Sequence, residues 1–251
     1  MNNSSNKCAV ILAGGEGKRM KSDIPKPMNE VLGRPMLRWV IDAVREAGVD
    51  DICVVTGFKK EITEDYLASL PFPVATAYQS ERLGTGHAVM MARSFLEEKG
   101  GDVVILCGDA PFMDAATIRD ALIQHDAGGY SATVISAMLD DPTGYGRIVR
   151  HPDGSLSNIV EHKEADEQTR AIREVNSGAY WFDTADLLSV LDKITSNNSS
   201  KEYYLPDALY LLLAQGKKAG AFTAASPDAV LGANDPAQLE ELNQIARAKG
   251  Y

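Results

Sequence analysis

The sequence has few cysteines and no long apolar run. Its 251 residues contain three cysteines, Cys8, Cys53 and Cys107, and each lies within an apolar, β-rich stretch, which is typical of reduced core thiols rather than of a disulfide framework. No apolar run approaches the roughly 20 residues that a membrane-spanning helix requires. Residues 1–7 are polar and lack the apolar stretch of a signal peptide. These absences predict a cytoplasmic protein with no membrane partner.

Basic residues are also in the minority. The chain carries 25 Lys plus Arg against 35 Asp plus Glu, a formal charge of −10 at pH 7. Because affinity for nucleic acid rests on many Lys and Arg contacts to phosphates, we expect no nucleic-acid partner. The balance is reversed between Gly17 and Pro27, where the only acidic residue is Asp23 and the basic residues are Lys18, Arg19, Lys21 and Lys26. This local cluster predicts a small anionic ligand.

The first 110 residues alternate apolar strands with helical patterns. Strands are expected at 8–13, 52–55, 74–78 and 102–107, and helices at 35–47, 59–69 and 85–98. This order predicts an α/β fold with a parallel sheet covered by helices on both faces, and ligands at the carboxyl ends of the strands. The second half is expected to form a mixed sheet, with strands near 131–138, 146–150, 156–160 and 175–182 and helices near 183–193, 204–215 and 235–249.

A glycine-rich loop follows the first strand, with the sequence Gly-Gly-Glu-Gly at 14–17. The dinucleotide-binding fingerprint would need glycine at Met20, and a P-loop would need Ser or Thr at Arg19. A turn of this kind lets backbone N–H groups approach phosphate oxygens, and Arg19 could then bind a phosphate bidentately. The alternative is a tight turn with a solvated basic side. Lys26 lies between Pro25 and Pro27, which restrict its backbone and so hold its ammonium group at a defined place.

These motifs occur together in one known family. Residues 12–20 read Leu-Ala-Gly-Gly-x-Gly-x-Arg-Met and are followed by Pro25 and Lys26. Further segments are Leu-Gly-Thr-Gly-His-Ala at 83–88, Gly-Asp-x-Pro at 108–111, Asp-Asp-Pro-Thr-Gly-Tyr-Gly-Arg-Ile at 140–148, Ile-Val-Glu-His-Lys at 159–163, Asn-Ser-Gly at 176–178, Glu-Tyr-Tyr at 202–204 and Gly-x-Asn at 232–234. From about residue 8 to 236 the chain resembles the sugar-1-phosphate nucleotidyltransferases. Within them it resembles the uridyltransferase domain of the bacterial bifunctional N-acetylglucosamine-1-phosphate uridyltransferase/glucosamine-1-phosphate acetyltransferase.

The resemblance implies a Rossmann-like, GT-A-like three-layer sandwich with a mostly parallel mixed sheet and helices on both faces. It places a nucleotidyltransferase domain at 7–235, with a nucleotide-binding half at 8–110 and a sugar-binding half at 111–235, and a C-terminal helix at 236–251. The left-handed β-helix domain that carries acetyltransferase activity in such proteins has no counterpart in this sequence. Acetyltransferase activity is therefore not expected, and the oligomeric state stays open.

The activity that the resemblance implies is Mg²⁺-dependent transfer of a uridylyl group from UTP to N-acetylglucosamine 1-phosphate, giving UDP-N-acetylglucosamine for cell-envelope polymers. Since the attacking phosphate oxygen is already anionic, catalysis reduces to positioning the reactants and neutralising charge. One alternative is the same chemistry on another nucleotide or sugar 1-phosphate, such as glucose 1-phosphate or N-acetylmuramic acid 1-phosphate. Another is a non-catalytic sugar-nucleotide sensor, although a sensor would not need the catalytic and metal-binding residues.

By resemblance, Arg19 holds the leaving phosphates, Lys26 bridges toward the α-phosphoryl group, and Asp109 and Asn234 bind Mg²⁺. The alternatives are that Arg19 or Lys26 pairs with a carboxylate, that Asp109 caps a helix after Pro111, and that Asn234 is a turn or cap residue.

The resemblance also implies residues for the two substrates. Those for the nucleotide are Leu12, Ala13, Gly14, Gly15, Gln79, Gly84, Thr85 and Gly108, and the amide of Gln79 would match adjacent donor and acceptor groups of uracil. Those for the sugar are Gly146, Glu161, Asn176 and Tyr204, although Tyr204 could instead be a core residue. Lys18 and Arg82 replace Thr and Gln of the usual subfamily pattern, which bears on the choice of base and on phosphate contacts.

Overall fold

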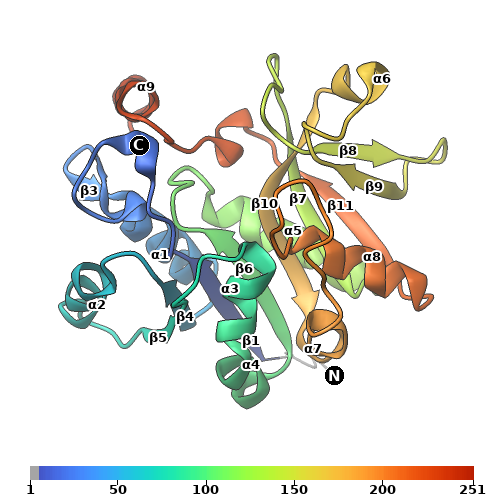
Figure 1. Ribbon diagram of the computed structural model, residues 1–251, viewed down its shortest axis with the longest axis horizontal. Coiled ribbons are helices and arrows are strands. Elements are labelled where there is room, and N and C mark those ends of the chain that lie inside the picture. The colour runs from blue at the N-terminus through green and yellow to red at the C-terminus, as the bar shows by residue number, and fades with distance from the viewer. Residues whose placement is uncertain (1–5) are drawn as a thin grey trace.

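A mixed β-sheet runs through the whole molecule (Figure 1). The computed structural model describes residues 6–251. In spatial order the main strands are β11 (Ala219–Thr223), β7 (Ala132–Met138), β10 (Glu174–Asp183), β6 (Asp102–Cys107), β1 (Lys7–Leu12), β4 (Asp51–Thr56) and β5 (Ala75–Tyr78). β6, β1, β4 and β5 are parallel, β10 is antiparallel to β6 and β7, and β11 is parallel to β7. The expected parallel first half and mixed second half therefore form one continuous sheet.

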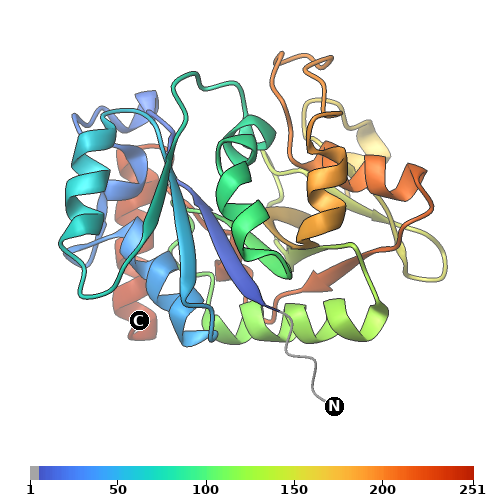
Figure 2. The same ribbon diagram turned by 90° about the horizontal axis from the view of Figure 1, so that it is seen from below.

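Helices cover both faces of this sheet (Figure 2). One face packs against α1 (Met36–Glu46) and α5 (Ala115–Gly128), and the other against α3 (Thr85–Met91), α4 (Arg93–Lys99), α7 (Thr184–Leu191) and α8 (Pro206–Ala214). Side chains of β1 alternate between the two cores, with Ala9 and Ile11 in one and Cys8 and Val10 in the other. This two-sided burial explains the uninterrupted apolar runs of the central strands. The expected three-layer α/β sandwich is confirmed.

Several elements differ from expectation. The helix expected at 85–98 is two helices, because at Ala92 the backbone N–H donates to Val89 O at 3.0 Å and closes a tight turn. The strand β11 was not expected, and a helix in the place of α5 was expected only in the alternative in which Asp109 caps it. Asp114 caps α5 by accepting from the backbone N–H of Thr117 at 2.8 Å. The alternative role of Asp109 as a helix cap is therefore wrong.

The remaining elements are short or lie at the edges of the fold. They are η1 (Lys18–Met20), η2 (Lys26–Met28), β2 (Glu30–Val31), β3 (Arg34–Pro35), α2 (Lys60–Ala68), β8 (Arg147–Arg150), β9 (Leu156–Val160), α6 (Glu167–Arg170), η3 (Pro227–Val230) and α9 (Pro236–Lys249). No helix within residues 6–251 is long and apolar enough to span a bilayer. The three cysteines are free, as expected, and burial raises the pKa of each to about 12.

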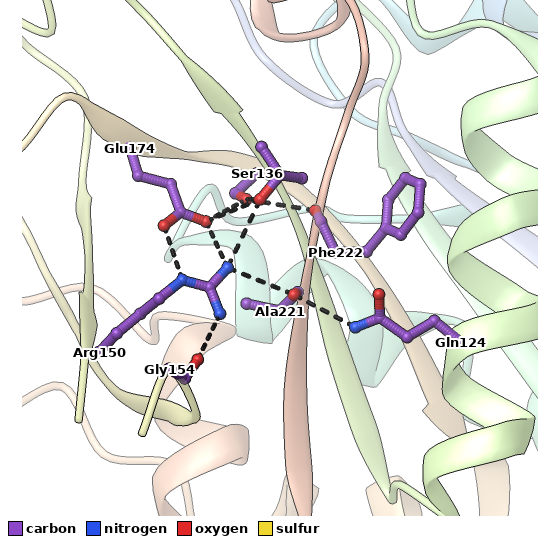
Figure 3. A network of polar contacts seen from close by, with 8 residues as sticks. Gln124, Ser136, Arg150, Gly154, Glu174, Ala221 and Phe222 are labelled. Atoms are coloured by element: carbon purple, nitrogen blue, oxygen red, sulfur yellow. Dashed lines mark hydrogen bonds and ion pairs between the residues drawn. The ribbon is translucent and has the colours of Figure 1, made fainter. Parts of the chain in front are cut away.

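The β8–β9 hairpin is joined to the main sheet by a buried polar network (Figure 3). Backbone pairing between β8 and β10 is limited to Arg147 opposite Val175. Arg150 of β8 donates to both carboxylate oxygens of Glu174, at 2.8 and 2.6 Å, and Ser136 donates to the same carboxylate at 2.6 Å. Side-chain contacts thus tie the hairpin to β7 and β10 where backbone pairing is sparse.

The C-terminal helix α9 packs on the segment that carries Lys26. The backbone N–H of Leu32, beside β2, donates to Asn243 Oδ1 at 2.8 Å. At the end of the chain the ring of Tyr251 stacks on Phe112, with centroids 4.8 Å apart. Residues 236–251 therefore pack directly against earlier parts of the chain and share a core cluster with them.

Candidate functional site

Two adjoining cavities lie at the carboxyl ends of the parallel strands. The first, of about 280 Å³, is lined by Leu12, Gly14, Gly15, Lys26, Pro27, Gln79, Arg82, Gly84, Thr85, Ala88, Cys107, Asp109 and Glu202. The second, of about 290 Å³, is lined by Thr85, Cys107, Gly144, Tyr145, Gly146, Glu161, Asn176, Ser177, Gly178, Tyr180, Tyr204, Leu205 and Pro206. Thr85 and Cys107 line both, so the cavities share a wall. Their position agrees with the general placement of ligands in α/β sheets.

The glycine loop after β1 packs closely against the loop that follows β4. A Cβ on Gly57 would lie 2.5 Å from the carbonyl oxygen of Gly14, and the backbone N–H of Phe58 donates to that oxygen at 3.1 Å. No side chain fits at this close approach, so the neighbouring loop needs glycine at position 57. The backbone N–H groups of Ala13 and Gly108 donate to Val55 O and Leu12 O, each at 2.9 Å. These two N–H groups are therefore already hydrogen-bonded within the protein.

Arg19 lies outside the cavity wall. Gly17 has a left-handed backbone, with φ of +64°, and a Cβ there would lie 2.8 Å from Cβ of Lys26. The chain then enters η1, where the side chain of Arg19 is exposed and forms no hydrogen bond or ion pair with residues 6–251. Of the two residues expected to be catalytic, only Lys26 reaches the cavity in this structure.

Lys26 joins Asp109 and Asn234, two residues far from it in the sequence. Its Nζ donates to Asn234 Oδ1 at 2.7 Å and forms an ion pair with the carboxylate of Asp109. The side chains of Lys26 and Asp109 are only 15% and 25% exposed. A carboxylate oxygen and an amide oxygen therefore face one cation, and both are ligand types that Mg²⁺ prefers.

The backbone around this trio is closely packed. A Cβ on Gly232 would lie 2.8 Å from the carbonyl oxygen of Asp109. Asp235, not Asn234, is the side-chain cap of α9, since it accepts from the backbone N–H of Gln238 at 2.9 Å. The alternative role of Asn234 as a helix cap is therefore wrong, and its amide oxygen points to Lys26 instead.

Gln79 is nearly buried in the wall of the first cavity, at 5% exposure. Its Nε2 donates to Gly84 O at 3.1 Å and lies 3.1 Å from Nδ1 of His87. In this geometry the amide nitrogen of Gln79 is engaged with Gly84 and His87 and is not free to donate to a base. Gln79 was expected to offer a base both a donor and an acceptor, but here it offers only the acceptor Oε1. Gly84 has φ of +110°, and a Cβ there would lie 2.5 Å from Tyr203 O.

The four residues expected to bind the sugar all line the second cavity. The backbone N–H of Asn176 donates to Gly146 O at 2.9 Å, and the Asn176 side-chain amide donates to the hydroxyl of Tyr180 at 2.7 Å. A Cβ on Gly146 would lie 3.2 Å from Oε1 of Glu161. Burial raises the pKa of Glu161, and the nearby carboxylates Glu164 and Asp207 act in the same direction. Tyr204 is half-buried at the rim.

Three residues outside the expected set of site residues also line the cavities, and one of them, Arg82, was already noted for its bearing on base choice and phosphate contacts. Arg82 lines the first cavity and donates to Glu16 Oε2 at 2.9 Å. Cys107 lies in the shared wall, and Tyr180 lies in the second cavity. Since Cys107 and Tyr180 lie within strand-like apolar runs, the sequence pattern indicates core positions, and only the packing shows that they face a cavity.

Several known proteins are similar to this chain in sequence. The family model for nucleotidyl transferases matches residues 8–227. The bifunctional protein GlmU of Acetivibrio thermocellus is 45% identical over 241 residues, which is 96% of this chain and 52% of that protein. The GlmU protein of Geobacillus thermodenitrificans is 44% identical over 239 residues, 95% of this chain and 51% of that protein. The chain thus spans about half the length of the curated relatives it matches.

Solved structures share the fold at low sequence identity. A UDP-glucose pyrophosphorylase complexed with UDP-glucose superposes with a TM-score of 0.81 at 18% identity, covering 97% of this chain and 99% of the other. A putative glucose-1-phosphate thymidylyltransferase from Bacillus anthracis, in complex with a sucrose, gives a TM-score of 0.77 at 19% identity, covering 96% and 95%. At this identity the superpositions establish the architecture alone.

Proposed function

This chain belongs to the nucleotidyl transferase family, and we propose that within it the chain transfers a uridylyl group from UTP to N-acetylglucosamine 1-phosphate. The products would be UDP-N-acetylglucosamine and pyrophosphate. The observation that carries the proposal is the half-buried trio of Lys26, Asp109 and Asn234 beside two cavities that share a wall. The identity of 44–45% to bifunctional GlmU proteins supports the choice of substrates.

The two cavities suit two substrates. The first would take the nucleotide, with Gln79 at the base and the glycine loop at the phosphates, since backbone N–H groups of such turns bind anions. The second would take the sugar, with Glu161 and Asn176 binding ring hydroxyls and the backbone of Gly146 binding the N-acetyl group. Their shared wall would bring the sugar phosphate next to the α-phosphoryl group.

The chemistry needs no general base, because the attacking oxygen of the sugar phosphate is already anionic. Lys26 would stabilise the negative charge that develops at the α-phosphoryl group, a contribution that is large in a water-excluded site. Asp109 and Asn234 would hold a Mg²⁺ ion, which would supply charge neutralisation for the triphosphate. Arg19, exposed at the end of the glycine loop, would hold the leaving pyrophosphate.

The test is pyrophosphate release over a matrix of nucleoside triphosphates and sugar 1-phosphates with Mg²⁺. We expect the highest kcat/KM for UTP with N-acetylglucosamine 1-phosphate. A maximum at glucose 1-phosphate, N-acetylmuramic acid 1-phosphate or another nucleotide would keep the mechanism and reject the substrates. Binding of UDP-N-acetylglucosamine without release of pyrophosphate from any pair would reject an enzyme in favour of a sensor.

Replacing Asp109 by asparagine is expected to raise the Mg²⁺ concentration for half-maximal activity by at least tenfold, or ~1.4 kcal/mol. Asparagine keeps the size of the side chain and removes its charge, and Mg²⁺ is a hard cation that prefers carboxylate oxygen. The measurement is a Mg²⁺ titration of pyrophosphate release at saturating substrates.

Asp114→Asn is the matched control. Asp114 lies five positions further along the chain, and asparagine is an equally good helix cap. Its Mg²⁺ titration should coincide with that of the unmodified protein. Coincidence of all three titrations would contradict the metal-binding role of Asp109.

A further inference from the structure

The side-chain amide of Gln79 has a determined orientation. One Nε2 hydrogen donates to the carbonyl oxygen of Gly84 at 3.1 Å. A carbonyl oxygen can only accept a hydrogen bond, so the nitrogen and not the oxygen of the amide faces Gly84. Turning the amide over would place two acceptors against each other in a wall where Gln79 is only 5% exposed.

His87 takes the second hydrogen of the same nitrogen. Its Nδ1 lies 3.1 Å from Nε2 of Gln79. Because an amide nitrogen only donates, Nδ1 must accept, and the neutral ring then carries its proton on Nε2. The ring of His87 lies on α3 and beside the ring of Tyr203, with centroids 6.2 Å apart.

The only polar side-chain atom of Gln79 left for a ligand is Oε1. It lies against Gly14, where a Cβ would approach it to 2.9 Å, and both residues line the first cavity. A base bound there meets an acceptor. The N3–H of uracil can donate to it, whereas N3 of cytosine is itself an acceptor and would be left desolvated and unpaired.

We propose that His87 is a positioning residue that holds the amide oxygen of Gln79 toward the cavity and so selects a pyrimidine with N3–H over cytosine. This inference rests on the proposed function in one respect, that the first cavity receives the base. His87 does not itself line the cavity. Its effect on the choice between uracil and cytosine depends on which ring nitrogen carries the proton.

The test compares His87→Phe with His87→Asn. Phenylalanine keeps a ring beside Tyr203 but has no acceptor, whereas the asparagine carbonyl can replace Nδ1. The dissociation constants of UTP and CTP are measured by calorimetry with Mg²⁺. We expect the ratio of CTP to UTP dissociation constants to fall at least fivefold in His87→Phe and to stay within twofold in His87→Asn. An unchanged ratio in His87→Phe would overturn the proposal.

Two further measurements keep the result interpretable. Tyr203→Leu removes the ring contact without touching the hydrogen bond, and its nucleotide ratio should not change; a fall equal to that of His87→Phe would assign the effect to packing and overturn the proposal. In the unmodified protein, ¹⁵N NMR of His87 should show a protonated Nε2 and a bare Nδ1. A protonated Nδ1 would overturn the proposal whether or not any variant folds.

Failure of the proposed function has a different signature. In that case no pair of substrates releases pyrophosphate, while the nucleotide ratio and the ring tautomer still report on His87. Conversely, pyrophosphate release from UTP with an unchanged ratio in His87→Phe would leave the function in place and remove only the role of His87.

Discussion

Replacing Lys26 by methionine is expected to lower kcat for pyrophosphate release by at least 100-fold. Methionine keeps much of the length and apolar stem of lysine but loses the charge. The ammonium group of Lys26 is largely removed from solvent between Asp109 and Asn234, and loss of one preorganised donor to a transition state costs about 10²–10³ in kcat. The measurement is kcat and KM at saturating Mg²⁺, with the effect expected mainly in kcat.

Lys60→Met is the matched control for this variant. Lys60 forms a helical ion pair with Glu64 at 3.7 Å and lines neither cavity. Its kcat should stay within twofold of the unmodified protein. If Lys26→Met retained a third or more of kcat with unchanged thermal stability, Lys26 would have no role in the chemical step.

Replacing Glu174 by alanine is expected to lower the free energy of unfolding by about 3–5 kcal/mol. The carboxylate of Glu174 is 11% exposed and accepts from Arg150 and Ser136, which join the β8–β9 hairpin to β7 and β10. Without it, Arg150 keeps a partly buried and unpaired charge. The measurement is urea denaturation at pH 7, analysed as a two-state transition.

The difference in unfolding free energy between the unmodified protein and Glu174→Ala should depend on pH. Burial acts to raise the pKa of Glu174, but hydrogen bonds from Arg150 and Ser136 prevail and lower it below its ordinary value of 4.5. A carboxylate whose pKa is lower in the folded state than in the unfolded state stabilises the fold at pH values above its unfolded pKa. This contribution is lost as the pH falls through the folded pKa. The stability difference should therefore shrink as pH falls below about 4.5.

Glu240→Ala is the control for the loss of a surface pair. Glu240 is 57% exposed and lies 3.4 Å from Arg247, and pairs of this kind contribute roughly 0–1 kcal/mol. Equal losses of stability in Glu174→Ala and Glu240→Ala would show that the network of Figure 3 does not hold the hairpin.

The central strands and the class of fold can be predicted from the sequence alone. β1, β4 and β6 are buried on both faces, and burial on both faces requires the uninterrupted apolar runs that are visible along the chain. The missed strand β11 lacks such a signal. β11 reads Ala-Gly-Ala-Phe-Thr, with a single large apolar side chain, and its pairing with β7 comes from tertiary contact.

Motifs in the sequence predicted Lys26, Asp109, Asn234 and Gln79 as site residues, but their contacts with one another and with their neighbours are seen only in the folded structure. Lys26 and Asn234 are 208 positions apart and in contact, whereas Arg19, only seven positions before Lys26, lies outside the cavity wall. The free acceptor of Gln79 depends on Gly84 and His87. The physical reason is that periodicity and turn residues reflect interactions between residues close to one another in the chain. The distances between charged groups and the orientation of an amide depend on side chains that are distant in the chain and meet only on folding.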